Sequence, residues 1–300
     1  SSASRFVRSH VTYVGNTHFY NRQIQDVPHC HPSTNQDWTT LMKILVENPM
    51  TSSFQFLIAQ EGGEVLGFVH YSVKRPKKKN EQGPGQGIIP FLAYPRGQRQ
   101  VGQALIEAAE ADFRARAVHR VVAFPFSDSY PFYHLDQASL SDRLDHVQAL
   151  LTFNGYARKD GEVFMDWMDF QPAVPLLLDS YGDIVLTWME GKGPLPNLQV
   201  EAVQDKKSLG LCECLSFRHF GNLTLERDWL FVKGLNVAKG MQGQKLGLYL
   251  LQRALEEMRQ AHYRHAAISA SHDNPRAFLF YSNHGFRAFD TTYEFVRELT

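Results

Sequence analysis

Residues 242–248, Gln-Gly-Gln-Lys-Leu-Gly-Leu, form a glycine-bearing turn between an extended apolar run and a helical run. Residues 229–237 before the turn are rich in strand-forming side chains, and the leucines after it recur at the spacing of one helix face. The first turn of a helix has unpaired backbone N–H groups and the positive end of the helix dipole. A glycine such as Gly243 or Gly247 lets an anion approach the main chain without meeting a Cβ atom. The sequence therefore predicts an anion site here, and a pyrophosphate is the expected ligand.

A second motif follows at residues 274–286, Asn-Pro-Arg-Ala-Phe-Leu-Phe-Tyr-Ser-Asn-His-Gly-Phe. Together with the turn, it resembles the GNAT superfamily of acyl-coenzyme A dependent N-acyltransferases. The family signatures read Gln/Arg-x-x-Gly-x-Gly/Ala and Asn-x-x-Ala-x-x-x-Tyr-x-x-x-Gly-Phe, and the second is matched at every named position. In the first signature Gln242 and Gly247 match, while Lys245 stands where the family has a glycine.

The resemblance implies a role for each matched residue. Tyr281 would be the general acid, because a phenol with a pKa of about 10 can give its proton to the departing thiolate. Asn274 would bond the pantetheine amides. The remaining coenzyme-binding residues that the resemblance implies are Leu235, Asn236 and Val237 for pantetheine or the thioester carbonyl, and Gln242, Gly243, Gln244, Lys245, Leu246, Gly247 and Leu248 for the pyrophosphate.

Each of these residues also has a purely structural interpretation. Tyr281 can be a core aromatic of its helix, and Gly247 can be a glycine that begins a helix. The surrounding signature favours the functional interpretation of both. His284, which lies beside the Tyr281 turn, is expected to be a surface histidine.

The sequence does not single out a general base. The family often uses a carboxylate on its fourth strand, or water, and the usual position falls on or near Phe231. Glu213, Glu226 and Asp228 are the nearby carboxylates, and each can equally be a solvated residue at a strand end.

No metal cofactor is expected. Pro28-His-Cys-His-Pro32 brings three metal-ligating side chains together, but no second cluster at zinc-like spacing accompanies it, so this segment is interpreted as a loop. The chain has three cysteines, which cannot form a closed disulfide framework and therefore agree with a reducing cytosol. Cys212 and Cys214 are expected to be small core hydrophobes on one strand face.

The composition excludes several partner classes. Lys plus Arg (31) equals Asp plus Glu (31), so no global field would recruit nucleic acid or an anionic membrane. No apolar run approaches the roughly 20 residues that span a bilayer, and the N-terminus lacks a secretory apolar segment. We expect a cytoplasmic protein with no nucleic-acid or membrane partner, and nothing in the sequence indicates an oligomeric state.

The elements that must position these residues occur twice along the chain. Each copy has a hairpin, a strand, a glycine turn, a helix and another strand, and residues 94–106 align without gaps on 239–251, pairing Gly102 with Gly247. Three hundred residues suffice for two such cores. We therefore predict an α/β (α+β) chain of two GNAT-like domains, 1–171 and 172–300, each with a mixed, mostly antiparallel central sheet flanked by helices.

The two copies differ where chemistry would occur. The first offers Arg99-x-x-Gly102-x-Ala104, which formally matches the coenzyme loop. Its second signature is lost, because Leu151 occupies the tyrosine position and Leu144 the asparagine position. The N-terminal domain is therefore predicted to be catalytically silent.

The resemblance implies an N-acetyltransferase whose C-terminal domain transfers an acetyl or other acyl group directly from acetyl-CoA to a primary amine of a small molecule. Acetyl-CoA would be the co-substrate. Two other functions stay open: a non-catalytic acyl-CoA binding or regulatory protein, and a protein or peptide N-acetyltransferase.

Overall fold

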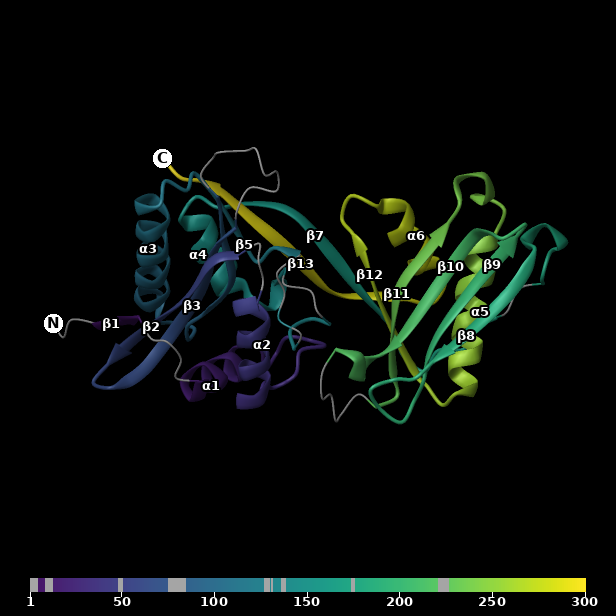
Figure 1. Ribbon diagram of the computed structural model, residues 1–300, viewed down its shortest axis with the longest axis horizontal. Helices are drawn as coiled ribbons and strands as arrows, with labels where there is room; N and C mark the ends of the chain where they lie inside the picture. Colours follow the sequence, from purple (N-terminus) through teal and green to yellow (C-terminus); the bar gives the residue numbers. More distant parts are fainter. Residues whose placement is uncertain are drawn as a thin grey trace. The chain divides into compact units, whose positions relative to one another are not determined.

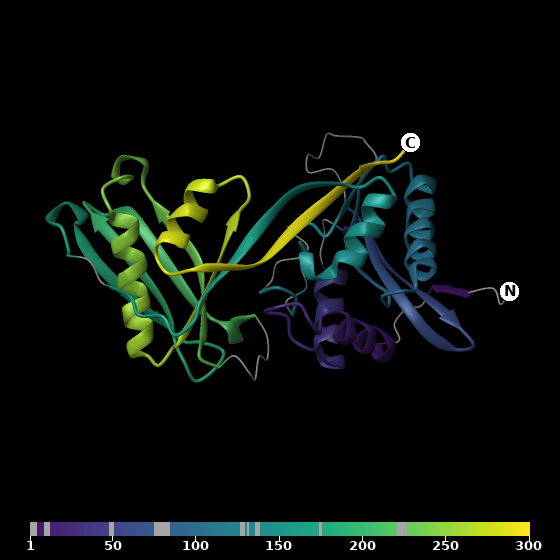
Figure 2. The same cartoon turned by 180° about the vertical axis from the view of Figure 1, so that it is seen from behind.

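The computed structural model describes residues 5–8, 13–47, 51–74, 85–126, 130, 132–135, 139–173, 176–220 and 227–300. Contacts within it divide the chain into two compact units (Figures 1 and 2). Unit 1 comprises residues 1–162 and 290–300, and unit 2 comprises residues 163–289. Both are α/β units with a mixed sheet flanked by helices, as the sequence predicted.

Unit 1 has a sheet of order β1-β2-β3-β4-β5-β13-β7, in which β4 and β5 are parallel. Helix α3 packs against β2, β3 and β4, and α1 packs against α2, β3 and β4. The bounds are β1 Arg5–Arg8, α1 Tyr13–Gln23, α2 Asn35–Glu47, β2 Thr51–Glu61, β3 Glu64–Lys74, β4 Gln86–Ala93, α3 Arg99–Ala115, β5 Arg120–Ala123, β6 Leu140–Ser141, α4 Asp145–Phe153, β7 Ala157–Trp167 and β13 Arg287–Glu298.

Unit 2 has a sheet of order β7-β12-β11-β10-β9-β8, in which β11 and β12 are parallel. Helix α5 covers one face of β9, β10 and β11, as Figure 1 shows. The bounds are β8 Asp183–Met189, β9 Asn197–Gln204, β10 Lys207–Ser216, β11 Trp229–Val237, α5 Leu246–Gln260, β12 His265–Ser271 and α6 Pro275–Asn283. The two units repeat the order hairpin, strand, helix, strand, helix, closing strand, as expected for a duplication.

The closing strands are exchanged between the copies. β7 follows α4 of unit 1, yet from Val163 onward it belongs to unit 2, where it is the neighbour of β12. β13 follows α6 of unit 2, yet from Asp290 onward it belongs to unit 1, where residues 295–298 pair with β5. This division differs from the predicted domains 1–171 and 172–300. The boundary lies inside β7, and residues 290–300 complete the first unit, because each copy contributes its closing strand to the other sheet.

Each unit has its own core. In unit 1 an aromatic cluster around Tyr20, Trp38 and Phe91 fills the interior. In unit 2 four leucines of α5, Leu246, Leu250, Leu251 and Leu255, are fully buried against the sheet, at the spacing that predicted the helix. Cys212 and Cys214 are buried in the same core, which confirms that they act as small hydrophobes.

Two further findings concern the described residues. None of their helices has the length and apolar character needed to cross a membrane. Within the same ranges, no three His, Cys, Asp or Glu side chains are grouped as a metal site.

Candidate active site

The site in unit 2 begins where β11 leaves its neighbour β12. These strands pair only over residues 229–231 and 265–267, whereas β11 continues beside β10 to Val237. The β10–β11 register shifts between Glu213 and Cys214, so that Lys233 is an extra residue in β11. The C-terminal half of β11 is therefore not paired with β12, and its residues Leu235 and Val237 line a cavity.

The predicted anion turn connects this half of β11 to α5. Gly243 (φ 80°) and Lys245 (φ 63°) both adopt left-handed backbone conformations, and α5 begins at Leu246. The Gln244 side-chain amide donates to the carbonyl of Gly240 (2.8 Å), and the Tyr181 hydroxyl donates to the carbonyl of Gln244 (2.8 Å). No side chain caps the N-terminus of α5, so its first N–H groups stay available to an anion.

A cavity of about 640 Å³ connects this turn with α6. An added Cβ at Gly247 would meet only Val237, at 3.3 Å, so the glycine leaves the cavity open beside the helix start. Ten of the predicted site residues line the cavity: Leu235, Val237, Gln242, Gly243, Lys245, Leu246, Gly247, Leu248, Asn274 and Tyr281.

Two predicted residues are not brought into the lining. Asn236 has an exposed side chain, and the Gln244 side chain is bonded back to Gly240. Five lining residues were missed: Met241, Arg276, Ala277, Phe280 and His284. Those on α6 recur at helical spacing with Asn274 and Tyr281, a signal that would have found them.

Tyr281 lines the cavity with 7% of its surface exposed, packed against Phe280 and Phe286. Burial raises the pKa of Tyr281 above its usual value, and the nearby Cys212 thiol raises it further. The phenol therefore keeps its proton at neutral pH. Its hydroxyl has no hydrogen bond to any described residue, which leaves the proton available to a ligand atom in the cavity.

Asn274 caps α6, since its Oδ1 accepts a hydrogen bond from the N–H of Ala277 (3.1 Å). The Nδ2 group is not bonded to a described residue, so it can donate to a ligand carbonyl. Gly285, where α6 ends, has φ 104°, and an added Cβ would lie 2.5 Å from the Trp167 ring. Only glycine fits beneath this ring, and Phe286 packs beside it. The Gly-Phe pair thus fixes the orientation of the helix that carries Tyr281.

The charges around the cavity favour an anion. Lys245 and Arg276 line it, and no Asp or Glu does among the lining residues. His284, at the end of α6, has its pKa lowered by burial and is therefore neutral at pH 7.

Among the described residues, the carboxylates considered as general bases, Asp228 and Glu213, are not part of the cavity lining. Asp228 precedes β11 at the end remote from the turn, with its Oδ2 3.8 Å from both Arg264 Nη1 and His265 Nε2. Glu213 pairs with Gly234, and strand alternation directs its side chain to the face opposite the buried Cys212. Phe231 is a buried aromatic, and Glu226 lies outside the described residues. None is assigned as the base.

The equivalent region of unit 1 is filled. A Cβ at Gly102 would meet Leu150 at 2.6 Å and Tyr94 at 2.7 Å. The Tyr94 hydroxyl donates to the carbonyl of His146 (2.7 Å), and His146 Nε2 bonds the carbonyl of Tyr94 (3.2 Å). Two smaller cavities, of about 230 and 310 Å³, are both lined by Tyr94 and His146. Tyr94 and His146 thus lie in the lining of both of these unit 1 cavities.

Comparisons with known proteins find one similar family and several similar folds. Residues 162–286 match the acetyltransferase (GNAT) family, whereas no curated protein matches the chain. A tandem GNAT protein from the clavulanic acid biosynthesis pathway, solved without AcCoA, has a TM-score of 0.68 and 15% identity, covering 99% of this chain and 98% of that one.

Two other solved structures are similar over nearly the whole chain. A glucosamine N-acetyltransferase region in a fungal multi-domain GH3 beta-N-acetylglucosaminidase has a TM-score of 0.67 and 12% identity, covering 98% of this chain and 38% of that one. A GCN5-related N-acetyltransferase from Sphaerobacter thermophilus has a TM-score of 0.58 and 13% identity, covering 99% and 97%. The chain therefore has the fold of a tandem GNAT protein, and its residues 162–286 match the GNAT acetyltransferase family.

Proposed function

We propose that unit 2 transfers an acetyl group from acetyl-CoA directly to a primary amine of a small molecule. The match of residues 162–286 to the acetyltransferase family supports acyl transfer in general. The observation that carries the specific proposal is a cavity lined both by the start of α5, which no side chain caps, and by Tyr281. The Tyr281 hydroxyl is protonated at neutral pH and has no hydrogen bond to a described residue.

Each residue around the cavity then has a defined task. The N–H groups at the start of α5, with the Lys245 ammonium, would bind the pyrophosphate. Asn274 Nδ2 would donate to a pantetheine carbonyl, and the exposed edge of β11 beside Leu235 would hold the thioester. When the amine nitrogen bonds the acyl carbon and the carbon–sulfur bond breaks, Tyr281 gives its proton to the sulfur. The amine passes its own proton to solvent.

Unit 1 would not perform this reaction. Tyr94 and Leu150 fill the space above Gly102, and the position equivalent to Tyr281 is the buried Leu151, which has no proton to give. The proposed role of the unit is to complete the fold through the exchanged strands.

The test is release of free thiol from acetyl-CoA in the presence of a panel of primary amines: aliphatic amines, amino sugars and amino acid amides. Tyr281→Phe should lower kcat by about 10²-fold or more and change the Kd of coenzyme A by less than about twofold, because a general acid contributes about 10² to 10⁴ in rate. The control is Tyr249→Phe in α5, which lies outside the cavity lining and should behave as wild type.

Three results would redirect the proposal. Full activity in Tyr281→Phe would remove the tyrosine as acid. Coenzyme A binding without thiol release would indicate a binding or regulatory protein. Activity confined to a protein N-terminus or peptide would identify a protein N-acetyltransferase.

A further inference from the structure

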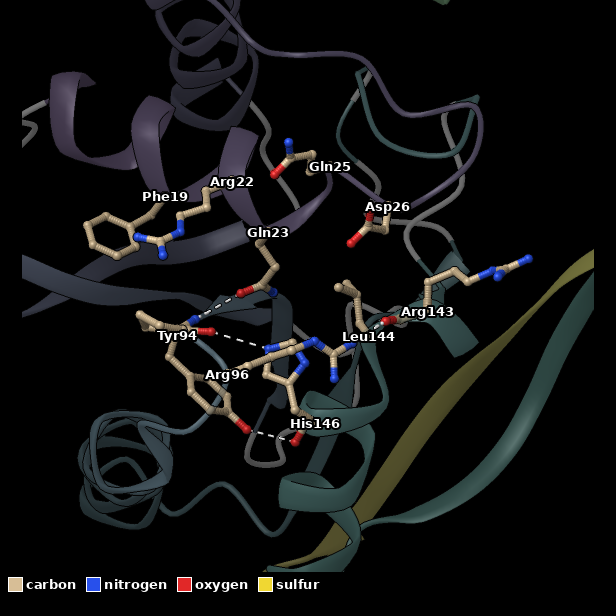
Figure 3. Close-up of a pocket in the computed structure, with 11 residues that line it drawn as sticks. Phe19, Arg22, Gln23, Gln25, Asp26, Tyr94, Arg96, Arg143, Leu144 and His146 are labelled. Atoms are coloured by element: carbon tan, nitrogen blue, oxygen red, sulfur yellow. Dashed lines mark hydrogen bonds between the residues drawn. The ribbon is translucent and has the colours of Figure 1, made fainter.

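Unit 1 contains a cavity that the proposed acyl transfer does not use. It has a volume of about 230 Å³ and lies between the end of α1, the residues after β4 and the start of α4 (Figure 3). The side chains that matter most for its chemistry are Phe19, Arg22, Asp26, Tyr94, Arg96 and His146.

The walls of this cavity are fixed by hydrogen bonds between distant parts of the unit. Gln23 Nε2 donates to the carbonyl of Leu92 (2.7 Å), and its Oε1 accepts from the N–H of Tyr94 (2.9 Å). The Tyr94–His146 bonds connect this wall to α4 (Figure 3). A preformed cavity binds a small ligand without a large cost for ordering its own side chains.

Two opposite charges border the cavity without being paired. Arg22 and Asp26 lie on opposite sides of Gln23 (Figure 3), and neither has a hydrogen bond or ion pair with a described residue. Arg96 is different, because its guanidinium bonds the Asp145 carboxylate and also the carbonyl of Arg143 (2.8 Å). Arg143 also lines the cavity and has an interaction of its own. Among the described lining residues, the exposed Arg22 and Asp26 are therefore the cation and the anion available to a ligand.

We propose that this cavity binds a small zwitterion with one carboxylate and one ammonium group, the class to which free amino acids belong. Arg22 would receive the carboxylate, because a guanidinium binds a carboxylate in a bidentate manner, and Asp26 would receive the ammonium. The half-buried Phe19 ring supplies an apolar wall for the rest of the ligand. Coenzyme A does not fit here, because the volume is small and Tyr94 with His146 separates it from the neighbouring cavity.

The experiment is calorimetric titration of the full chain with glycine, L-alanine, L-leucine, L-glutamate, L-lysine and L-phenylalanine, each in turn. At least one should bind with a Kd of about 1 mM or tighter. L-alaninamide and propionate, which each lack one of the charges of alanine, should bind at least about tenfold more weakly than the best amino acid. Arg22→Gln and Asp26→Asn should each weaken that amino acid by about tenfold or more.

The controls separate this site from the acyltransferase site. Arg120→Gln removes an exposed arginine of the same unit, outside the cavity lining, and should leave the affinity unchanged. Tyr281→Phe should also bind the amino acid as wild type does, whether or not the protein proves to be an acetyltransferase. Absence of binding by all six amino acids at about 10 mM would overturn the proposal, and so would binding that neither Arg22→Gln nor Asp26→Asn weakens while circular dichroism shows both variants to be folded.

Discussion

Lys245 occupies a backbone position that a side chain normally avoids. Its φ of 63° lies in the left-handed region, which costs an ordinary residue about 1–2 kcal/mol and a glycine almost nothing. The family signature has a glycine here, so the turn follows the path that a glycine would take although the residue differs. Lys245 lines the cavity, where a positive charge favours an anion. This gives a reason for a lysine at a backbone position where glycine would be less strained.

Replacing Lys245 by glycine and by alanine separates the effect of backbone strain on stability from the effect of the ammonium charge on coenzyme A affinity. Both variants lose the ammonium and should bind coenzyme A several-fold more weakly at low salt, with a smaller difference at high salt. Lys245→Gly relieves the left-handed strain, so its free energy of unfolding should exceed that of Lys245→Ala by about 1 kcal/mol. Urea denaturation measures the stability and calorimetry the affinity. Equal stability of the two variants would show that the turn is unstrained.

Most of the residues around Tyr281 could be predicted because the signature places them at fixed spacing. Met241 could not be predicted in the same way, because no chemistry marks it and only the fold brings it to the cavity. Asn236 was predicted for its backbone N–H group, which stays a prediction; its side chain is exposed, and the extra residue Lys233 changes which strand residues share a face.

At the scale of elements, β13 is attached to unit 1 by a buried polar cluster. Asp290 Oδ2 bonds His134 Nε2 (2.8 Å) and accepts from Ser141 Oγ (2.7 Å), and the His134 and Asp290 side chains are fully buried. Burial opposes the charge and raises the pKa of Asp290, but the hydrogen bonds from His134 and Ser141 outweigh it, so the net pKa lies below the usual value. The cluster therefore stabilises the exchanged strand when Asp290 is ionised.

Asp290→Asn tests this attachment. A folded-state pKa below the unfolded value, about 3.9, means that the carboxylate stabilises the fold above that pH and less as the pH falls through the folded pKa. The variant should lose about 1–3 kcal/mol of unfolding free energy at pH 7, and the difference should shrink below about pH 4. In protein labelled with fluorotryptophan, fluorine NMR during urea denaturation can report on unit 1 through Trp38. The other three tryptophans, Trp167, Trp188 and Trp229, lie in unit 2.

The matched control is Asp160→Asn, an exposed carboxylate of the same unit beside Lys159, which should leave stability nearly unchanged. A loss of stability in Asp290→Asn that is the same at pH 7 and pH 4 would assign the effect to packing rather than to charge.

The strand exchange itself could not be predicted from the sequence. Residues 157–167 and 287–298 both have the extended apolar pattern of a closing strand, and that pattern identifies a strand without identifying its neighbour. The partner of β13 is decided by specific contacts such as Asp290 with His134, which are far apart along the chain. Helix α1 was not predicted either, because its sequence is mostly polar and lacks a clear apolar face. It is held by Tyr20, which packs against Trp38 in the aromatic core.

At the scale of the whole molecule, two copies of one element order have different interiors. Gly102 and Gly247 align with each other near the starts of α3 and α5, but Leu150 and Tyr94 cover the first, while the second is close only to Val237 and lines the cavity. Side-chain bonds between Gln103 and Asn154 also join α3 to α4. The two copies therefore share their fold, whereas the glycine near the helix start lines an open cavity only in unit 2.

Coenzyme A should accordingly bind once per chain. Calorimetric titration of wild type should give a stoichiometry of about one, and Gly247→Phe should weaken binding by more than about 10²-fold, because the ring would project into the cavity beside the α5 start. The control Leu248→Ala changes a neighbouring residue without filling the cavity and should keep the stoichiometry of the wild type. If unit 1 held a second coenzyme, Gly247→Phe would retain one full-affinity site. Residual binding of that kind would show that the contacts of Tyr94 and Leu150 above Gly102 open in solution.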